Sequence, residues 1–203
     1  MIHTSLEFLT HELNEYLMLK TGTSDERIFM TNVANDEGVA IPGKSLGLSL
    51  INIEEERTFK EQKATSVNID GDVIRRNSEI KMNLYILITA NFQEDNVSEE
   101  SNSKPAYLDG LKQLSYVISF FQAKNVFNAA NSPSMAGFDS EIKRLIVELY
   151  SYDFDQLNNF WSVLGTNYLP SVLYKVRSVR FQEDAILDSN LPIERISLKT
   201  GGN

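Results

Sequence analysis

The stretch Ile80-Lys81-Met82-Asn83-Leu84-Tyr85-Ile86-Leu87-Ile88-Thr89-Ala90-Asn91-Phe92 decides the fold, because apolar and polar side chains alternate along it. Side chains of a β-strand point alternately to the two faces of a sheet. The even-numbered residues are apolar and the odd-numbered ones are mostly polar, with Leu87 as the exception. The pattern therefore predicts a long strand in an antiparallel or mixed sheet that has one buried and one mostly polar face.

Other strands follow from shorter patterns of the same kind. They are Arg27–Val33, Leu46–Ile53, Ile142–Tyr150 and Val172–Phe181. The apolar residues change phase after Leu50, and again around Ser178, and each change predicts a β-bulge or a flip of the strand. Asp70-Gly71 lies between short β-branched runs, a strong signal for a hairpin. We expect that segment to project from the sheet.

Three helices are expected from apolar residues at helical spacing. Thr4 and Glu7 match a capping box at the start of the first helix, and Gly22 ends it. Asp153 begins the third helix in the same way, and Gly165 ends it. The stripes are Leu6, Leu9, Leu13 and Leu17; then Tyr107, Leu111, Leu114, Ile118 and Phe121; then Phe154, Leu157, Trp161 and Leu164. The order of elements predicts an α/β (α+β) fold, a mixed and mainly antiparallel sheet with two or three helices packed on one face.

Length and composition favour a single folded domain in 203 residues. We expect the domain in residues 1–187 and a polar arm in residues 188–203, with acidic or irregular loops at 93–103 and 125–139. A net charge of −9 argues against nucleic acid and anionic membranes as partners. The N-terminus has no basic leader, and the longest apolar run, Leu84–Ala90, is too short for membrane insertion. We therefore expect synthesis and folding in the cytoplasm.

The residues that carry chemistry in enzymes are scarce or badly spaced in this sequence. It contains no Cys, and His3 and His11 are two helical turns apart, which favours surface or interface roles. Glu54-Glu55-Glu56 falls at a strand end, where alternation separates neighbours, so we expect a solvated edge there. Asp70-Gly71-Asp72 lacks the remaining ligands of a calcium loop. We predict no catalytic residue, no cofactor and no metal site, and hence no enzyme.

A basic strand face is the one charged feature that stands out. Lys175 and Arg177 lie on the face opposite Tyr174, and Arg180 follows on the same strand. Such a face can meet an acidic partner surface, and the alternative is an ordinary solvent-facing strand.

One segment resembles the closing signature of the tail-terminator (cap) family of contractile injection systems. It reads Asn159-Phe160-Trp161-Ser162-Val163-Leu164-Gly165-Thr166-Asn167-Tyr168-Leu169-Pro170-Ser171-Val172-Leu173-Tyr174-Lys175-Val176-Arg177. Met82–Ala90 and Tyr107–Phe127 resemble the central strand and long helix of that family, in the same order. The sequence departs from the family at Leu169 and at Ser78-Glu79. The matching residues are Trp161, Gly165, Tyr168, Pro170, Ser171 and Tyr174, of which we expect the three aromatic ones in the core.

The resemblance implies a structural protein rather than an enzyme. It implies a homo-hexameric ring at the distal end of the inner tube and sheath, with the tube and sheath proteins as partners, in a particle that can be released from the cell. Candidate contacts within the ring or to the tube and sheath are Asp70, Gly71, Lys175, Arg177 and Arg180. An available sheet edge would be a docking site for a partner's strand. The alternatives are a baseplate or tube-adaptor component of the same particle, or a small ligand-binding module.

Overall fold

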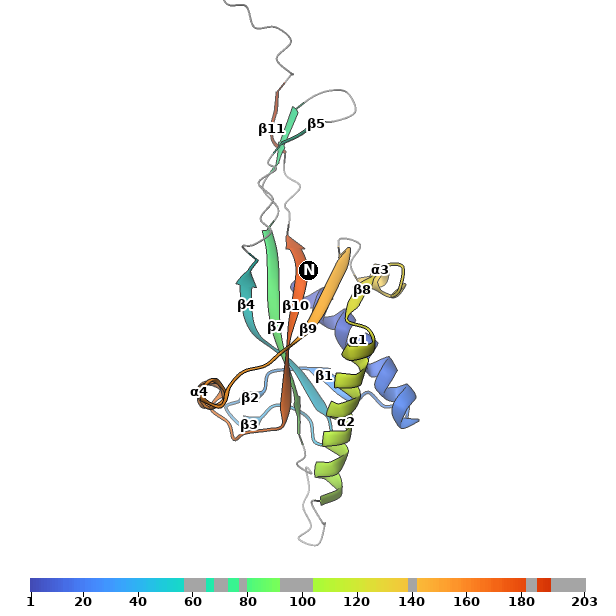
Figure 1. Cartoon of the computed structure of the whole chain (residues 1–203), viewed down its shortest axis with the longest axis vertical. Coiled ribbons are helices and arrows are strands. Elements are labelled where there is room, and N and C mark those ends of the chain that lie inside the picture. The colour runs from blue at the N-terminus through green and yellow to red at the C-terminus, as the bar shows by residue number, and fades with distance from the viewer. Residues whose placement is uncertain are drawn as a thin grey trace, which may run out of the picture.

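A curled six-stranded sheet organises the computed structural model, which describes residues 1–56, 65–67, 73–76, 80–91, 104–138, 142–181 and 186–190 (Figure 1). The strand order is β1-β4-β7-β10-β9-β8. The strands are β1 (Ile28–Met30), β4 (Leu46–Glu55), β7 (Ile80–Ala90), β8 (Val126–Asn128), β9 (Arg144–Tyr150) and β10 (Ser171–Phe181). The β1–β4 pair is parallel and the other pairs of this sheet are antiparallel. The predicted mixed, mainly antiparallel sheet with helices is therefore confirmed.

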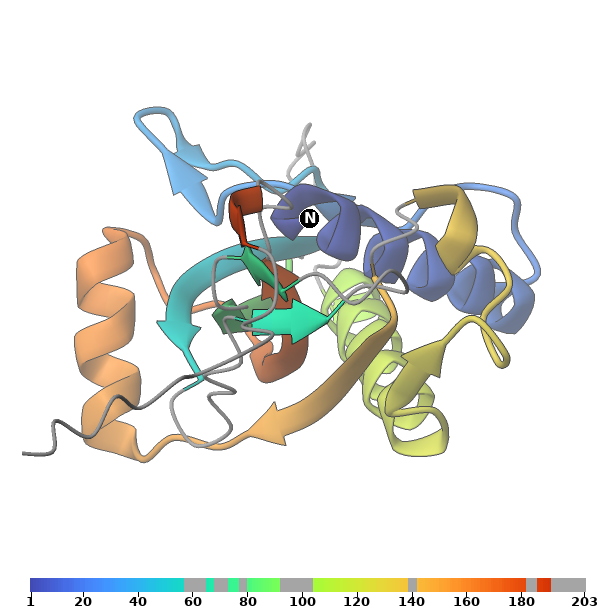
Figure 2. The ribbon, with the colours of Figure 1, turned by 90° about the horizontal axis from the view of Figure 1, so that it is seen from above.

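Helices cover both faces of this sheet. They are α1 (Ile2–Thr21), α2 (Lys104–Ala123), α3 (Met135–Phe138) and α4 (Phe154–Leu164). Figures 1 and 2 show α1, α2 and α3 on one side, and α4 on the other beside the small hairpin of β2 (Ala34–Asn35) and β3 (Gly38–Val39). The sequence predicts two or three helices on one face of the sheet. The third of them, α4, lies on the opposite face.

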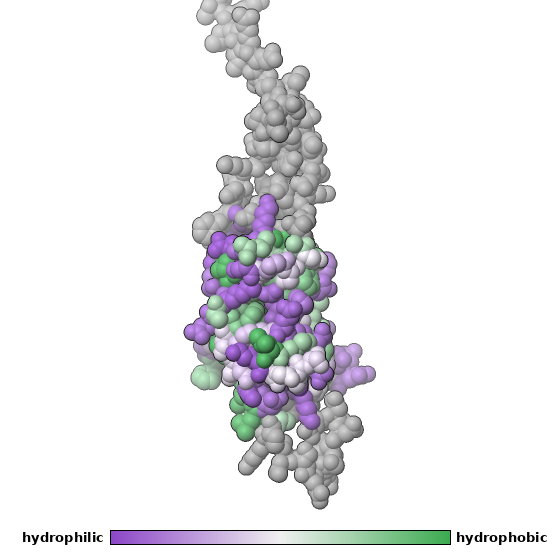
Figure 3. Space-filling view, turned by 90° about the vertical axis from the view of Figure 1, so that its right-hand side faces the viewer, coloured by the Kyte–Doolittle hydropathy of each residue, from purple (hydrophilic) through white to green (hydrophobic). Residues whose placement is uncertain are grey.

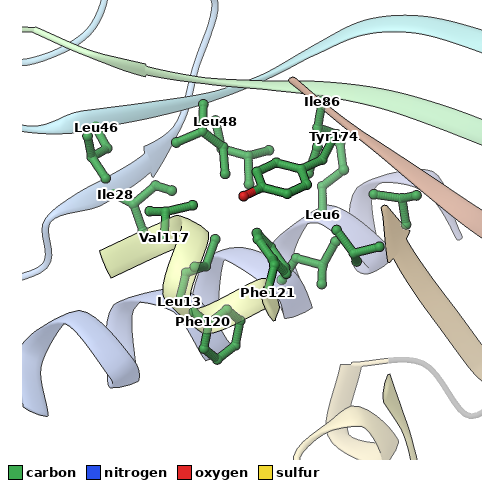
Figure 4. Close-up of a cluster of buried hydrophobic side chains, with 14 of the residues drawn as sticks. Leu6, Leu13, Ile28, Leu46, Leu48, Ile86, Val117, Phe120, Phe121 and Tyr174 are labelled. Atoms are coloured by element: carbon green, nitrogen blue, oxygen red, sulfur yellow. The ribbon is translucent and has the colours of Figure 1, made fainter. Parts of the chain in front are cut away.

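The main core lies between the sheet and α1, α2 and α3. It unites Leu84, Ile86, Ile88 and Ala90 of β7 with Leu6, Leu9, Leu13 and Leu17 of α1, as the alternation predicts, whereas Ile80 at the start of β7 is exposed (Figure 4). On α2 the buried apolar side chains are Leu114, Val117, Phe120 and Phe121, whereas Tyr107 and Ile118 are exposed. The stripe predicted for this helix is therefore partly wrong, because packing against α1 selects a face turned slightly from the one that spacing suggests.

A second apolar cluster occupies the opposite face. It consists of Val33, Leu87, Trp161, Leu169 and Leu173. Leu87, the exception in the alternation of β7, packs here beneath α4. The face expected to be mostly polar is therefore divided into an apolar half under α4 and a polar half.

The ends of α1 and α4 show which of the predicted helix caps are present. Helix α1 begins at Ile2, and the Thr4 hydroxyl donates to the Met1 carbonyl from inside the first turn, so the capping box proposed there is wrong. Gly22 ends α1 in the left-handed conformation with φ 70°, as expected. The capping box of α4 is present: the Asp153 side chain accepts from the Gln156 backbone N–H.

Both irregularities predicted in the long strands are present. The register shifts between Leu50 and Asn52 in β4, and between Val176 and Val179 in β10. The segment expected as a loop at 125–139 instead contains β8 and α3, and the loop before β4 contains β2 and β3. The first strand is shorter than Arg27–Val33. The expected acidic loop at 93–103 lies outside the described residues.

A separate three-stranded sheet lies beyond the ends of β4, β7 and β10 (Figure 1). Strand β6 (Val73–Arg76) pairs antiparallel with both β5 (Thr65–Val67) and β11 (Ile186–Asn190). The predicted projecting hairpin is thus confirmed, although Asp70 and Gly71 lie outside the described residues. Strand β11 was not expected, and it spans the proposed boundary between domain and arm at residues 187 and 188.

Replacing Gly47 with alanine is expected to lower the free energy of unfolding by about 1–3 kcal/mol through overpacking. A Cβ atom added at Gly47 would lie 2.5 Å from Cγ1 and 2.8 Å from Cδ1 of Ile41, which is buried. Gly137→Ala is the matched control, because nothing lies within 4 Å of a Cβ atom there. Urea denaturation of both variants checks the prediction, and equal losses would contradict it.

Candidate assembly interface

Charged side chains from neighbouring strands meet on the polar half of the sheet. The Lys175 Nζ lies 3.5 Å from Oε2 of Glu54 and 5.3 Å from the centroid of the Tyr85 ring. The Tyr85 hydroxyl donates to the same Glu54 oxygen at 2.7 Å. Lys175 of β10 is therefore held over β7 by a carboxylate of β4.

Arg177 is paired on both sides. Its Nη2 lies 3.6 Å from Glu56 Oε2, and its Nη1 lies 3.3 Å from Glu148 Oε1. The Asn83 amide also donates to Glu56 at 3.1 Å. The basic strand face is real, but Glu54 of β4, Glu56 just after β4 and Glu148 of β9 balance it within the chain. Glu54 is exposed, in agreement with the solvated edge expected at Glu54-Glu55-Glu56. The prediction missed that Glu54 and Glu56 share a face and that both bind basic side chains of β10.

The electrostatics of this network favour its charged form. The hydrogen bond from Tyr85, followed by the charge of Lys175, lowers the pKa of Glu54. Partial burial lowers the pKa of Lys175, but its interactions with Tyr85 and Glu54 outweigh that effect and raise the pKa overall. Burial, and then the bond to Glu54, raise the pKa of Tyr85. The pair consequently stays ionised around neutral pH.

The side chain of an asparagine covers part of each outermost strand of the sheet. Asn14 on α1 donates to the Ile28 carbonyl at 2.9 Å and accepts from the Arg27 and Ile28 N–H groups at 2.9 and 3.0 Å. Asn131 donates to the Val126 carbonyl at 2.8 Å and accepts from the Asn128 N–H at 3.0 Å. Sequence reasoning singled out neither asparagine.

The outer side of β4 differs from these two edges. Strand β1 pairs with β4 only at residues 46–48, so β4 continues from Leu50 to Glu55 with no strand on its outer side in the described part of the chain. Leu50 and Ile53 are exposed on this stretch. It is the kind of edge that can take up an additional strand.

The residues of the family signature hold α4 and β10 in place. Trp161 is 6% exposed, whereas Tyr168, which we expected in the core, is 59% exposed and presents its ring to Trp161 at 5.5 Å. Gly165 ends α4 with φ 67°. The Pro170 carbonyl accepts from the Ala90 N–H at 3.0 Å, and Ser171 begins β10.

Tyr174 gives a prediction for alkaline pH. Its ring lies in the main core, 4.6 Å from that of Phe121 (Figure 4), and burial raises the pKa of Tyr174 to about 12. The pKa of an unfolded tyrosine is about 10. Because the folded pKa is the higher one, the contribution of Tyr174 to stability is complete below the unfolded value and is lost as pH rises through the folded one. We expect the free energy of unfolding to fall in that window, and Tyr174→Phe to reduce the fall. An identical pH dependence in both proteins would contradict the assignment.

The other candidate residues form no site among the described residues. His11 lies 3.5 Å from Glu15 and beside the Phe138 ring, and His3 is exposed. No group of three His, Cys, Asp or Glu residues in the described ranges could hold a metal ion. None of the helices described is long and apolar enough to cross a membrane. The backbone of Arg180 pairs with Lys81, and nothing further is described for it.

Comparison with known proteins gives a family and a shared fold. The profile of the family described as the Pvc16 N-terminal domain matches residues 6–195. Among solved structures, the sheath/tube terminator of the extracellular contractile injection system PVC, in its extended state, is similar with a TM-score of 0.56 and 15% identity, over 100% of this chain and 64% of that chain. The tube-terminating cap of the anti-feeding prophage matches with a TM-score of 0.46 and 14% identity, over 82% of this chain and 56% of that one.

The family profile and the solved structures cover this chain to different extents. No curated protein matches the sequence. The chain spans less than two thirds of the length of each of these two structures, and at this identity the first likeness shows a common fold. The family profile, in contrast, covers most of the chain. The protein therefore belongs to the Pvc16 N-terminal domain family, the tail-terminator family that the stretch from Asn159 to Arg177 resembles.

Proposed function

We propose that this protein is the structural cap, or tail terminator, of a contractile injection particle and acts without catalysis. One observation carries the proposal: the fold is shared, over the full length of this chain, with a protein described as a sheath/tube terminator. Membership of the same family over residues 6–195 supports it. The cap assembles in the cytoplasm and becomes part of a particle that acts outside the cell.

In this proposal six copies form a closed ring on the last layer of the inner tube and sheath. Contacts in such a ring are heterologous, so one patch of each copy meets a different patch of its neighbour. The outer side of β4 from Leu50 to Glu55 is available to an extended segment of a tube or sheath protein, since no strand of the described chain occupies it. Lys175, Arg177 and Arg180 belong to the proposed contacts, as does the loop at Asp70-Gly71.

Removing the protein from cells that make the particle tests the proposal. Negative-stain images should then show tubes of uncontrolled length or unstable sheaths, and the wild-type protein supplied in trans should restore uniform particles. Particles that lack baseplates would assign the protein to the baseplate or a tube adaptor instead. Normal particles would overturn every assembly role and leave a ligand-binding module.

A charge swap separates contacts with a partner from contacts within the sheet. Lys175→Glu removes the attraction to Glu54 and should lower stability only slightly, because the pair is exposed to solvent. The double variant Lys175→Glu with Glu54→Lys restores an opposite-charge pair. We expect thermal unfolding to recover in the double variant while incorporation into particles stays low, because the partner still meets a reversed charge. If incorporation recovers together with stability, Lys175 acts only within the sheet.

A further inference from the structure

We infer that Asn14 and Asn131 are edge blockers, whose amide groups occupy the two outermost strands, β1 and β8, and keep two copies of this chain from pairing at those two strands. The inference concerns the behaviour of the folded chain toward itself. It stands whether or not the protein caps a particle.

The physical reason is the chemical likeness between an asparagine side chain and a peptide group. An incoming strand binds an edge by donating to an outward carbonyl and accepting from an outward N–H. The carboxamide of Asn14 does both to Ile28, at 2.9 and 3.0 Å, and accepts from the Arg27 N–H as well. Asn14 is buried, so an approaching strand cannot easily displace it. The outward groups of Ile28 are thus already bound.

The opposite edge has the same arrangement, supplied by a different kind of segment. In β8 the outward groups belong to Val126 and Asn128, because Phe127 between them pairs toward β9. Asn131 binds the Val126 carbonyl and the Asn128 N–H. The Asn128 carbonyl accepts in turn from the N–H groups of Asn131 and Ser132, at 3.2 and 2.9 Å. Three of the outward groups of β8 are therefore bound within the chain.

Asn14 and Asn131 come from different kinds of segment, which argues that covering the outer sides of β1 and β8 matters to this protein. Asn14 comes from the middle of a helix and Asn131 from a turn, and they lie at opposite ends of the strand order. Unpaired outer strands otherwise act as templates for association between copies. On the side of the molecule that Figure 3 shows, apolar patches are small and interspersed with polar residues.

Asn131→Ala tests the inference at an exposed turn, where it also removes the bond that the Ser132 hydroxyl donates to Asn131 at 3.1 Å. Asn131 is exposed, and its turn keeps the bonds from the Ala130 and Asn131 N–H groups to the Asn128 side chain at 2.9 and 3.1 Å. Asn159→Ala, at an exposed asparagine on α4, is the matched control. Sedimentation velocity over a wide range of concentration should show dimers and larger species for Asn131→Ala beyond those of the wild type and the control. In monomeric Asn131→Ala, the backbone amide of Asn128 should exchange its hydrogen faster than in the wild type, because it has lost its bond to Asn131.

A charged replacement distinguishes edge pairing from partial unfolding. Asn131→Lys also loses the bonds to Val126 and Asn128, but a lysine in the turn beside the edge strand opposes the approach of a second copy by its charge. We expect this variant to exchange quickly at Asn128 and yet to sediment like the wild type. The inference is overturned if Asn131→Ala sediments like the wild type, if the Asn128 amide exchanges no faster, or if Asn131→Lys associates as strongly as Asn131→Ala.

Discussion

Trp161→Ala is expected to lower the free energy of unfolding by about 3–5 kcal/mol, the range measured for truncation of a buried large aromatic side chain. Trp161 is the largest member of the cluster that joins α4 to the sheet, and it packs with Leu87 and Leu173. Its ring also meets those of Phe160 and Tyr168. The variant loses this anchor, so α4 should separate from the sheet before the rest of the molecule unfolds.

Phe154→Ala is the matched control for this variant. Phe154 is an aromatic residue of the same helix but is 88% exposed, so its removal should change stability by no more than about 0.5 kcal/mol. Because Trp161 is the only tryptophan, unfolding is followed by circular dichroism, and detachment of α4 by hydrogen exchange. A loss in Trp161→Ala that is no larger than in Phe154→Ala would show that the cluster does not hold the helix.

Asn14→Ala is expected to lower the free energy of unfolding by about 1–3 kcal/mol, the cost of leaving a buried group without its hydrogen-bond partner. The variant leaves the Ile28 carbonyl and the N–H groups of Arg27 and Ile28 without their partner at the junction of α1 and β1. Asn14→Asp keeps the acceptor but loses the donor, so we expect an intermediate loss. Urea denaturation checks both, with Asn159→Ala as the exposed control, and a loss as small as that of the control would contradict the prediction.

The sequence predicts the long strands well, because their signal is local. Alternation in β7 indicates its buried face, and the changes of phase at Leu50 and Ser178 correspond to register shifts in β4 and β10. Strand β8 escapes such reasoning, since its few residues become a strand only by pairing with β9. The same holds for β11, which depends on β6. Elements of this length are specified by distant partners rather than by their own pattern.

The candidate interface shows the same limit. Sequence reasoning placed Lys175 and Arg177 on one strand face, and they do lie together. Their acidic partners are distant in the sequence, and the order of strands decides which acids meet them. One signal was available: Glu54 and Glu56 are two residues apart and must share a face. For Asn14 the signal was a polar residue between Leu13 and Leu17 on the apolar side of a helix.

The three-stranded sheet has a mechanical consequence. Strands β5, β6 and β11 are joined along the chain to β4, β7 and β10, whose ends lie level, with Phe181 opposite Ile80 and Glu55 opposite Met82. Hydrogen bonds between antiparallel strands run perpendicular to the strands. A pull on the small sheet along these strands therefore acts on β4, β7 and β10 together and in the same direction, so the load is divided among three strands and does not slide β7 against its two neighbours.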